Sequence, residues 1–214
     1  MALTDKLSNI AVAIREKTGS SASLTLAQMP AAIRSIETGG TSDNKIADYI
    51  SGNIAVVSAA DLSGITRLRE YAFYKTNVQS IGMPSTLKTI GTYAFCQSNL
   101  QTVAIPSSVT SIESWAFAHC DGLQSVYINE GLTTIPSYCF FDSSNLKTIS
   151  IPKSVTTIKD HAFVSTQLQN IYYAGTPEEW AAINIDSDND GYLYGLGGTL
   201  ESPGMWAPTI HYNS

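Results

Sequence analysis

Apolar residues recur along most of the chain with a period of 22 to 23 residues. Each unit centres on a Phe preceded by a small residue, and successive Phe residues are 22, 22, 23 and 23 positions apart. Five aligned units at one period indicate a repeat architecture, in which each unit is one piece of supersecondary structure. The repeat anchors are Phe73, Phe95, Phe117, Phe140 and Phe163.

Within each unit, apolar and polar residues alternate after the Phe. Pairs such as Val103 and Ile105 enclose a single polar or small residue, and a period of two predicts a short, half-buried strand. Pro84, Pro106 and Pro152 are expected to end these strands, because proline cannot continue a hydrogen-bonded ladder. A second short extended piece is predicted at residues 87–90, 109–112, 132–135 and 155–158.

A single unit of this kind cannot bury its apolar side alone. Stacked coils can, because each coil bonds to the next through its backbone and packs its apolar side chains on its neighbour. The rise per coil should be about 4.8 Å, the ordinary spacing between strands. The sequence therefore predicts a β-rich solenoid of about five coils over residues 45–170.

One unit resembles the BspA-type leucine-rich repeat, whose consensus includes I-x-x-x-A-F-x-x-C-x-x-L. Residues 112–123 read Ile-Glu-Ser-Trp-Ala-Phe-Ala-His-Cys-Asp-Gly-Leu, and the position of Cys120 is filled in the other units by Thr76, Ser98, Ser143 and Thr166. The resemblance covers about residues 46–213. It implies a leucine-rich-repeat stack with a terminal cap, and it says less about function because the family is defined by its scaffold.

The two ends of the repeat region differ from its middle. Residues 45–69 are interpreted as a degenerate first coil with apolar positions at Ile54, Val56, Ile65 and Leu68. Residues 171–214 are predicted to form a C-terminal cap. In it, Thr-Pro-Glu-Glu at 176–179 has the order of a helix start, and Trp180 and Ile183 are expected to cover the last coil.

The first 38 residues have helical rather than strand periodicity. Two apolar stripes, from Leu3 to Ile14 and from Leu26 to Ile36, predict two short helices that suit a hairpin or an oligomer seam over residues 3–36. Residues 39–44, Gly-Gly-Thr-Ser-Asp-Asn, are interpreted as a linker. This module resembles the N-terminal segment of phage and prophage tail-associated proteins, through Ile-Ala-Val-Ala-Ile-Arg-Glu-Lys-Thr-Gly at 10–19.

Composition narrows the classes of partner and location. The formal net charge is −6, and the basic residues form no stripe, which argues against nucleic acid because phosphate binding needs clustered Lys and Arg. No apolar run is long enough to span a membrane. The residues after Met1 lack the apolar core of a secretory signal, so we expect either a removed signal, as on an extracellular surface protein, or assembly into a virion tail inside the cell.

The sequence shows no pattern typical of catalysis. His119, His161 and His211 lie in separate units, without the residues of a hydrolase elbow, a zinc motif or a phosphate loop. Cys96 and the other two cysteines, Cys120 and Cys139, form no CxxC pair and are expected to be buried free thiols. We therefore predict a protein that is not an enzyme and needs no cofactor.

One acidic segment bears on metal binding. Asp186, Asp188 and Asp190 are followed by Gly191, as at the start of a calcium loop. Gly197 stands where that loop needs an acidic ligand. The segment is therefore interpreted as a solvated acidic loop, and weak calcium binding is the alternative.

Two columns of aromatic residues are candidate ligand-binding surfaces. One stands two residues before each Phe and contains Tyr71, Tyr93, Trp115, Tyr138 and His161. It would either seal an edge of the stack or present an exposed ladder to sugar rings or a protein loop. The other lies on the predicted strands, where Tyr127 and Tyr172 stand among Gly82, Ala104 and Ser150.

Together these features favour a binding or adhesion scaffold. The first hypothesis is a tail-associated protein that recognises a cell-surface glycan or protein, with residues 3–36 joining it to an oligomer or larger assembly. The alternatives are a secreted bacterial surface adhesin and a structural spacer without a ligand.

Overall fold

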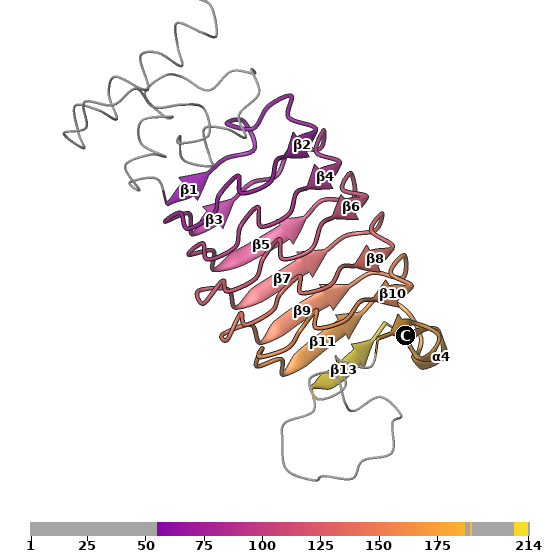
Figure 1. Ribbon diagram of the computed structural model, residues 1–214. Coiled ribbons are helices and arrows are strands. Elements are labelled where there is room, and N and C mark those ends of the chain that lie inside the picture. Colours follow the sequence, from indigo (N-terminus) through magenta and orange to yellow (C-terminus); the bar gives the residue numbers. More distant parts are fainter. Residues whose placement is uncertain (1–54, 187–188, 190–207, 214) are drawn as a thin grey trace, which may run out of the picture.

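Each repeat unit folds into one flattened coil, and successive coils stack side by side into a solenoid (Figure 1). The computed structural model describes residues 55–186, 189 and 208–213. The helical module at 1–38, the linker at 39–44 and the predicted oligomer seam lie outside the described residues. The predicted β-rich solenoid is confirmed.

One side of the solenoid is a parallel sheet of seven strands, which we call the long sheet. Its order is the chain order of the coils, so each coil contributes one strand and pairs only with its neighbours. The strands are β1 (Val56–Val57), β3 (Ser80–Ile81), β5 (Thr102–Ile105), β7 (Ser125–Ile128), β9 (Thr148–Ile151), β11 (Asn170–Tyr173) and β13 (Thr209–Tyr212). Pro106 and Pro152 directly follow β5 and β9, as expected.

The opposite side of each coil carries a second strand of only two residues. These strands form two parallel ladders of three. The first ladder contains β2 (Arg67–Leu68), β4 (Thr89–Ile90) and β6 (Ser111–Ile112), and the second contains β8 (Thr134–Ile135), β10 (Thr157–Ile158) and β12 (Asn184–Ile185). Strands β4, β6, β8 and β10 lie within the extended pieces that the sequence predicts, whereas β2 and β12 lie outside them.

The core lies between the two sides and contains one continuous column of rings. Phe73, Phe95, Phe117, Phe140 and Phe163 stack face to face, with ring centroids 5.0 to 5.5 Å apart. All five are buried. Burial of each ring stabilises the stack by about 1.5–3 kcal/mol, and each ring pair adds about 0.5–1.5 kcal/mol.

A buried polar column runs beside the Phe column and satisfies its carbonyl groups. The Thr76 hydroxyl donates to the Phe73 carbonyl at 2.8 Å, and the Ser143 hydroxyl donates to the Phe117 carbonyl at 2.8 Å. The Cys120 thiol donates to the Phe95 carbonyl at 3.0 Å. Hydroxyl and thiol side chains perform the same task here, which explains why Ser and Thr replace Cys at this repeat position.

The turn around each Phe holds two non-glycine residues in the left-handed conformation, one two positions before the Phe and one two positions after it, with φ between 53° and 64°. In the coil of Phe73 these are Tyr71 and Lys75. The backbone N–H groups of Tyr71, Phe73 and Lys75 all donate to carbonyls of the next coil, at 3.0, 2.6 and 3.0 Å. Each coil therefore gains inter-coil hydrogen bonds that offset the cost of a conformation that L-residues disfavour.

The first described coil corrects one prediction. Val56 was expected at an apolar core position, but it is 65% exposed while Val57 is 1% exposed. The parallel register pairs Val57 with the buried Ile81 and Val56 with Ser80. A shift of one residue moves a strand side chain to the other face of the sheet, so Val57 takes the core position.

The last coil is covered by the helix α4 (Pro177–Ala181). Thr176 caps it through a capping box: the Thr176 N–H donates to Glu179 Oε2 at 2.9 Å, and the Glu179 N–H donates to Thr176 Oγ1 at 3.3 Å. Trp180 and Ile183 are buried against the core, so the predicted helix start and its apolar cover are confirmed. Within the described part of the chain, no helix is long and apolar enough to cross a membrane.

Candidate functional site

The outward side of the long sheet carries two columns of side chains in exact register, which we call the sheet face. The first column contains Val56, Ser80, Thr102, Ser125, Thr148, Asn170 and Thr209. The second contains Ala104, Tyr127, Ser150, Tyr172 and His211. No carboxylate, ammonium or guanidinium group lies in either column, so the face offers hydroxyls, amides and aromatic rings but no fixed charge.

Two tyrosines stand out on this face. Tyr127 and Tyr172 are 49% and 46% exposed, and Ser150 lies between them in the register. The Tyr172 ring stacks on His211 with centroids 4.5 Å apart and planes 14° apart. His211 is fixed in turn by its Nε2 atom, 3.0 Å from Asn170 Oδ1.

His211 is a residue of this surface that the sequence interpretation missed. In the structure Ile210 pairs with Ile171, and His211 then takes the place next to Tyr172. From the sequence, His211 was placed only within the predicted C-terminal cap at 171–214. The cap strand β13 instead extends the long sheet, which brings the ring onto the sheet face.

The aromatic column that precedes the Phe anchors lies away from the sheet face, in the turn of each coil that leads into the long sheet. Tyr71, Tyr93, Trp115, Tyr138 and His161, here called the aromatic edge, stack in order with centroids 5.1, 5.8, 4.2 and 4.7 Å apart. All five are half-buried. The three inner rings therefore have another ring over each face, and only their rims reach solvent.

Further rings pack against the aromatic edge. Phe141 lies 5.4 Å from Trp115 and 5.5 Å from Tyr138, and Tyr74 meets Tyr71 edge-on at 5.4 Å. These residues, three positions after a column member, were not singled out from the sequence. Among the described residues, no ring contact joins this edge to Tyr127 or Tyr172, so the structure does not bring the two predicted sets together.

His161 of the aromatic edge and His119 beside it pair with acidic neighbours. His119 Nδ1 lies 3.0 Å from Asp142 Oδ2, and His161 Nδ1 lies 3.5 Å from Asp160 Oδ2. The Ser137 hydroxyl donates to Asp160 and, with His161, holds the pKa of that carboxyl below its usual value. The His119–Asp142 and Ser137–Asp160 contacts link consecutive coils, whereas His161 and Asp160 are neighbours in the sequence.

The described residues contain no group of three or more side chains able to hold a metal ion. Asp188 and Asp190 lie outside the described residues, and only Asp186 of the acidic segment is within them. Calcium binding therefore stays a prediction, as does the absence of catalysis.

The three cysteines are free and buried, as predicted. Burial raises the pKa of Cys96 to about 11 and that of Cys120 to about 12. It raises the pKa of Cys139 as well. Protonated, enclosed thiols are poor nucleophiles, so they act here as small core side chains.

One carboxylate ties three successive coils together on the side opposite the sheet face. Glu113 pairs with Arg67 at 2.7 Å and accepts from the Thr92 N–H and hydroxyl at 3.0 and 2.9 Å. Burial alone would raise the pKa of Glu113, but the hydrogen bonds from Arg67 and Thr92 hold it below its usual value. The charged form is thus the one that stabilises this side.

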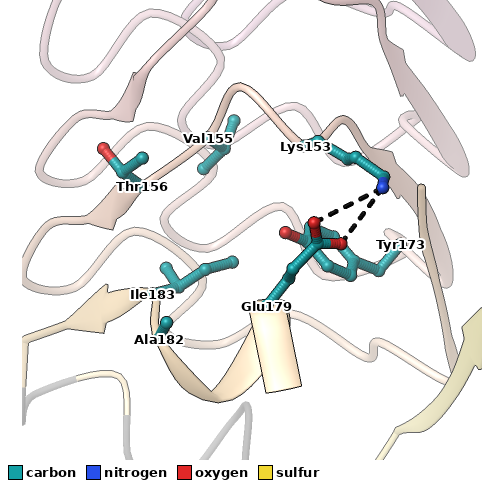
Figure 2. Close-up of a pocket in the computed structure, with 7 residues that line it drawn as sticks. All are labelled: Lys153, Val155, Thr156, Tyr173, Glu179, Ala182 and Ile183. Carbon is teal, nitrogen blue, oxygen red and sulfur yellow. Dashed lines mark hydrogen bonds and ion pairs between the residues drawn. The ribbon is translucent and has the colours of Figure 1, made fainter. Parts of the chain in front are cut away.

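A small cavity of about 210 Å³ lies between the last coil and α4 (Figure 2). Val155, Thr156, Ala182 and Ile183 line it, and Lys153 and Glu179 meet beside Tyr173. The ion pair is 3.2 Å long. Gly175 is required nearby, because a Cβ there would stand 2.4 Å from the Tyr173 ring. Lys153 and Glu179 pair with each other, so we interpret this cavity as part of the packing between α4 and the last coil and not as a ligand site.

Three solved structures are similar to this chain. The pneumococcal vaccine antigen PcpA is 21% identical over 63% of this chain and 30% of its own, with a TM-score of 0.48. A leucine-rich repeat protein from Bacteroides ovatus is 19% identical over 57% of this chain and 44% of its own, with a TM-score of 0.38. A leucine-rich cell surface protein from Faecalibacterium prausnitzii is 18% identical over 66% of this chain and 65% of its own, with a TM-score of 0.28.

This chain thus spans less than two thirds of each of these three structures. No curated protein sequence matches it. A family model described as the BspA type leucine rich repeat region matches six copies over residues 66–182, one copy more than the Phe anchors alone indicate. That span is more than half of the chain, and the chain therefore belongs to the BspA-type leucine-rich-repeat family.

Proposed function

We propose that this chain is a non-enzymatic adhesion scaffold that recognises a glycan or protein on a cell surface through its sheet face. The observation that carries the proposal is the pair of exposed rings, Tyr127 and Tyr172, on a face whose two columns hold no carboxylate, ammonium or guanidinium group. Tyr127 lies between Ala104 and Ser150 in its column, and Tyr172 lies between Ser150 and His211, so small residues at the same positions show that the strands themselves do not require a large ring. A spacer without a ligand has no need of it.

The aromatic edge has a different role in this proposal. Its inner rings cover one another's faces, so they cannot offer those faces to a sugar ring. The edge accordingly seals the turns of the coils. Of the two interpretations open for this column, we favour sealing over ligand binding.

A whole-cell assay tests the proposal. Fluorescently labelled chain would be titrated onto a panel of intact bacterial and mammalian cells and measured by flow cytometry. We expect saturable binding to at least one cell type, lost in the double variant Tyr127→Ala/Tyr172→Ala and kept in Thr110→Ala on the opposite side. Absence of saturable binding across the panel would favour the spacer, and equal binding by the double variant would move recognition off the sheet face.

Within this function, the finer hypothesis is a phage or prophage tail-associated protein, supported by the sequence of residues 3–36. The alternative is a secreted surface adhesin of the BspA type. Light scattering on the full chain and on a version that begins at Thr41 separates them. A fixed oligomer that becomes monomeric on truncation supports assembly through residues 3–36, whereas a monomer in both forms favours the free-standing adhesin.

A further inference from the structure

The orientation of Tyr172 defines a slot on the sheet face. Two rings lying flat on neighbouring strands could not bring their centroids to 4.5 Å, so the near-parallel rings of Tyr172 and His211 must overlap face to face along the direction that joins the strands. One face of Tyr172 is therefore covered by His211. The other face is directed along the sheet towards Ser150 on β9, and beyond it towards Tyr127 on β7.

The width of this slot follows from the sheet itself. Tyr127 and Tyr172 are two strands apart in the same column, and two steps of about 4.8 Å separate their backbones by roughly 10 Å. A six-membered ring between two aromatic side chains, with a contact of about 4 Å on each side, needs about 8 Å, so this separation is wide enough for one such ring. Ser150 lies between the two tyrosines in the register, with Thr148 and Asn170 in the adjoining column.

The chemistry of the slot selects the occupant. We infer that the slot between Tyr127 and Tyr172 binds a neutral saccharide, with one sugar ring over Ser150 and its C–H groups against the tyrosine rings. This inference rests on the proposed function and names the class of its ligand. Aromatic faces carry partial negative charge, which suits the weakly positive C–H groups of a pyranose, while hydroxyl and amide groups beside the rings suit its hydroxyls.

Charge argues against an acidic or basic ligand. Neither column of the sheet face holds a fixed charge, so a charged ligand would lose water without gaining an opposite charge. A protein ligand fits less well too. The exposed large apolar side chains among the described residues are Val56, Tyr127 and Tyr172, whereas a stable protein interface covers about 800 Å² per partner around a cluster of such anchors.

Affinity electrophoresis in native gels tests the inference. The gels would contain a soluble β-1,4-glucan, β-1,3-glucan, α-1,4-glucan or β-1,4-galactomannan, with heparin as the anionic comparator. We expect at least one neutral polysaccharide, and not heparin, to retard the full chain. Tyr127→Ala and Tyr172→Ala should each weaken this retardation by about tenfold, which corresponds to about 1.4 kcal/mol.

Matched variants keep the result interpretable. Tyr127→Phe and Tyr172→Phe retain the rings and should retain most of the binding, and Ser150→Trp should abolish it by filling the slot. Thermal unfolding of each variant verifies the fold. Equal retardation of the Ala variants and the unmodified chain would overturn the inference, as would retardation by heparin alone or by none of the polysaccharides.

The cell assay separates failure of this inference from failure of the proposed function. Cell binding that depends on Tyr127 and Tyr172, without retardation by any neutral polysaccharide, would leave the adhesion scaffold standing with a protein ligand. Absence of both kinds of binding would remove both proposals.

Discussion

The energetic cost of the left-handed turns can be tested at Gln97, where the exposed side chain contributes little to packing. Gln97 has φ of 58°, is exposed, and its N–H donates to the Ala118 carbonyl at 3.0 Å. A left-handed conformation costs an L-residue about 1–2 kcal/mol. Glycine avoids that cost, but its greater freedom in the unfolded chain costs about 0.5–1 kcal/mol relative to alanine.

The comparison to make is therefore Gln97→Gly against Gln97→Ala. The two magnitudes leave the Gly variant more stable than the Ala variant by about 0.5–1 kcal/mol. Gln101, four residues later and also exposed, directly precedes β5 and is not left-handed. There Gly should be less stable than Ala by about 0.5–1 kcal/mol, so the sign of the difference reverses between the two positions.

Urea denaturation followed by circular dichroism measures these differences, since midpoints at constant m-value report changes in stability. The four variants share one background, and each pair loses the same Gln side chain. If Ala is as good as Gly at Gln97, the left-handed turn is not a source of strain, and the inter-coil hydrogen bonds do not impose it. The same preference for Gly at both positions would contradict the reasoning as well.

Three further outcomes are expected. Phe117→Ala should lower the free energy of unfolding by about 3–5 kcal/mol and Phe117→Leu by clearly less, measured in urea; a loss under about 2 kcal/mol for Phe117→Ala would mean that the ring column relaxes around the gap. Cys96, Cys120 and Cys139 should not react with a disulfide reagent at pH 8 until denaturant is added, because burial raises their pKa values; rapid native-state labelling would contradict their enclosure. The pKa of Glu113 lies below its ordinary 4.5, so the stability that its carboxylate contributes is present above pH 4.5 and is lost as the pH falls through the lowered value. The difference in Tm between the unmodified chain and Glu113→Gln should therefore be larger at pH 7 than at pH 3. An equal difference at both pH values would refute the assignment.

The period of the apolar residues was sufficient to predict the core, because every coil has to meet the same packing requirement. Each coil must place a Phe and its aliphatic partners on the same residues of its neighbour, so errors in one unit are visible by comparison with the others. Val56 shows where this fails. The first coil has only one neighbour to align with, and a shift of one residue was enough to exchange Val56 and Val57 between solvent and core.

The candidate sites were harder to predict, since they depend on directions that a period does not contain. Ten left-handed residues, all of them non-glycine, orient the aromatic edge. Residue types such as Tyr71 and Trp115 do not predict a left-handed backbone. His211 required knowledge that β13 pairs with β11 across the segment from 190 to 207. Tyr127 and Tyr172, by contrast, were visible as outliers in a column of small residues.

The placement of Tyr127 and Tyr172 on separate coils makes the distance between them a matter of counting. Loss or duplication of one complete coil between the two would move them closer or farther by one strand spacing, about 4.8 Å, while every coil kept the same contacts with its neighbours. The solenoid therefore sets the distance between two surface residues in whole steps of one strand spacing. A lineage could change the size of the ligand it accepts in whole steps, through recombination between similar repeats, without redesigning the interior.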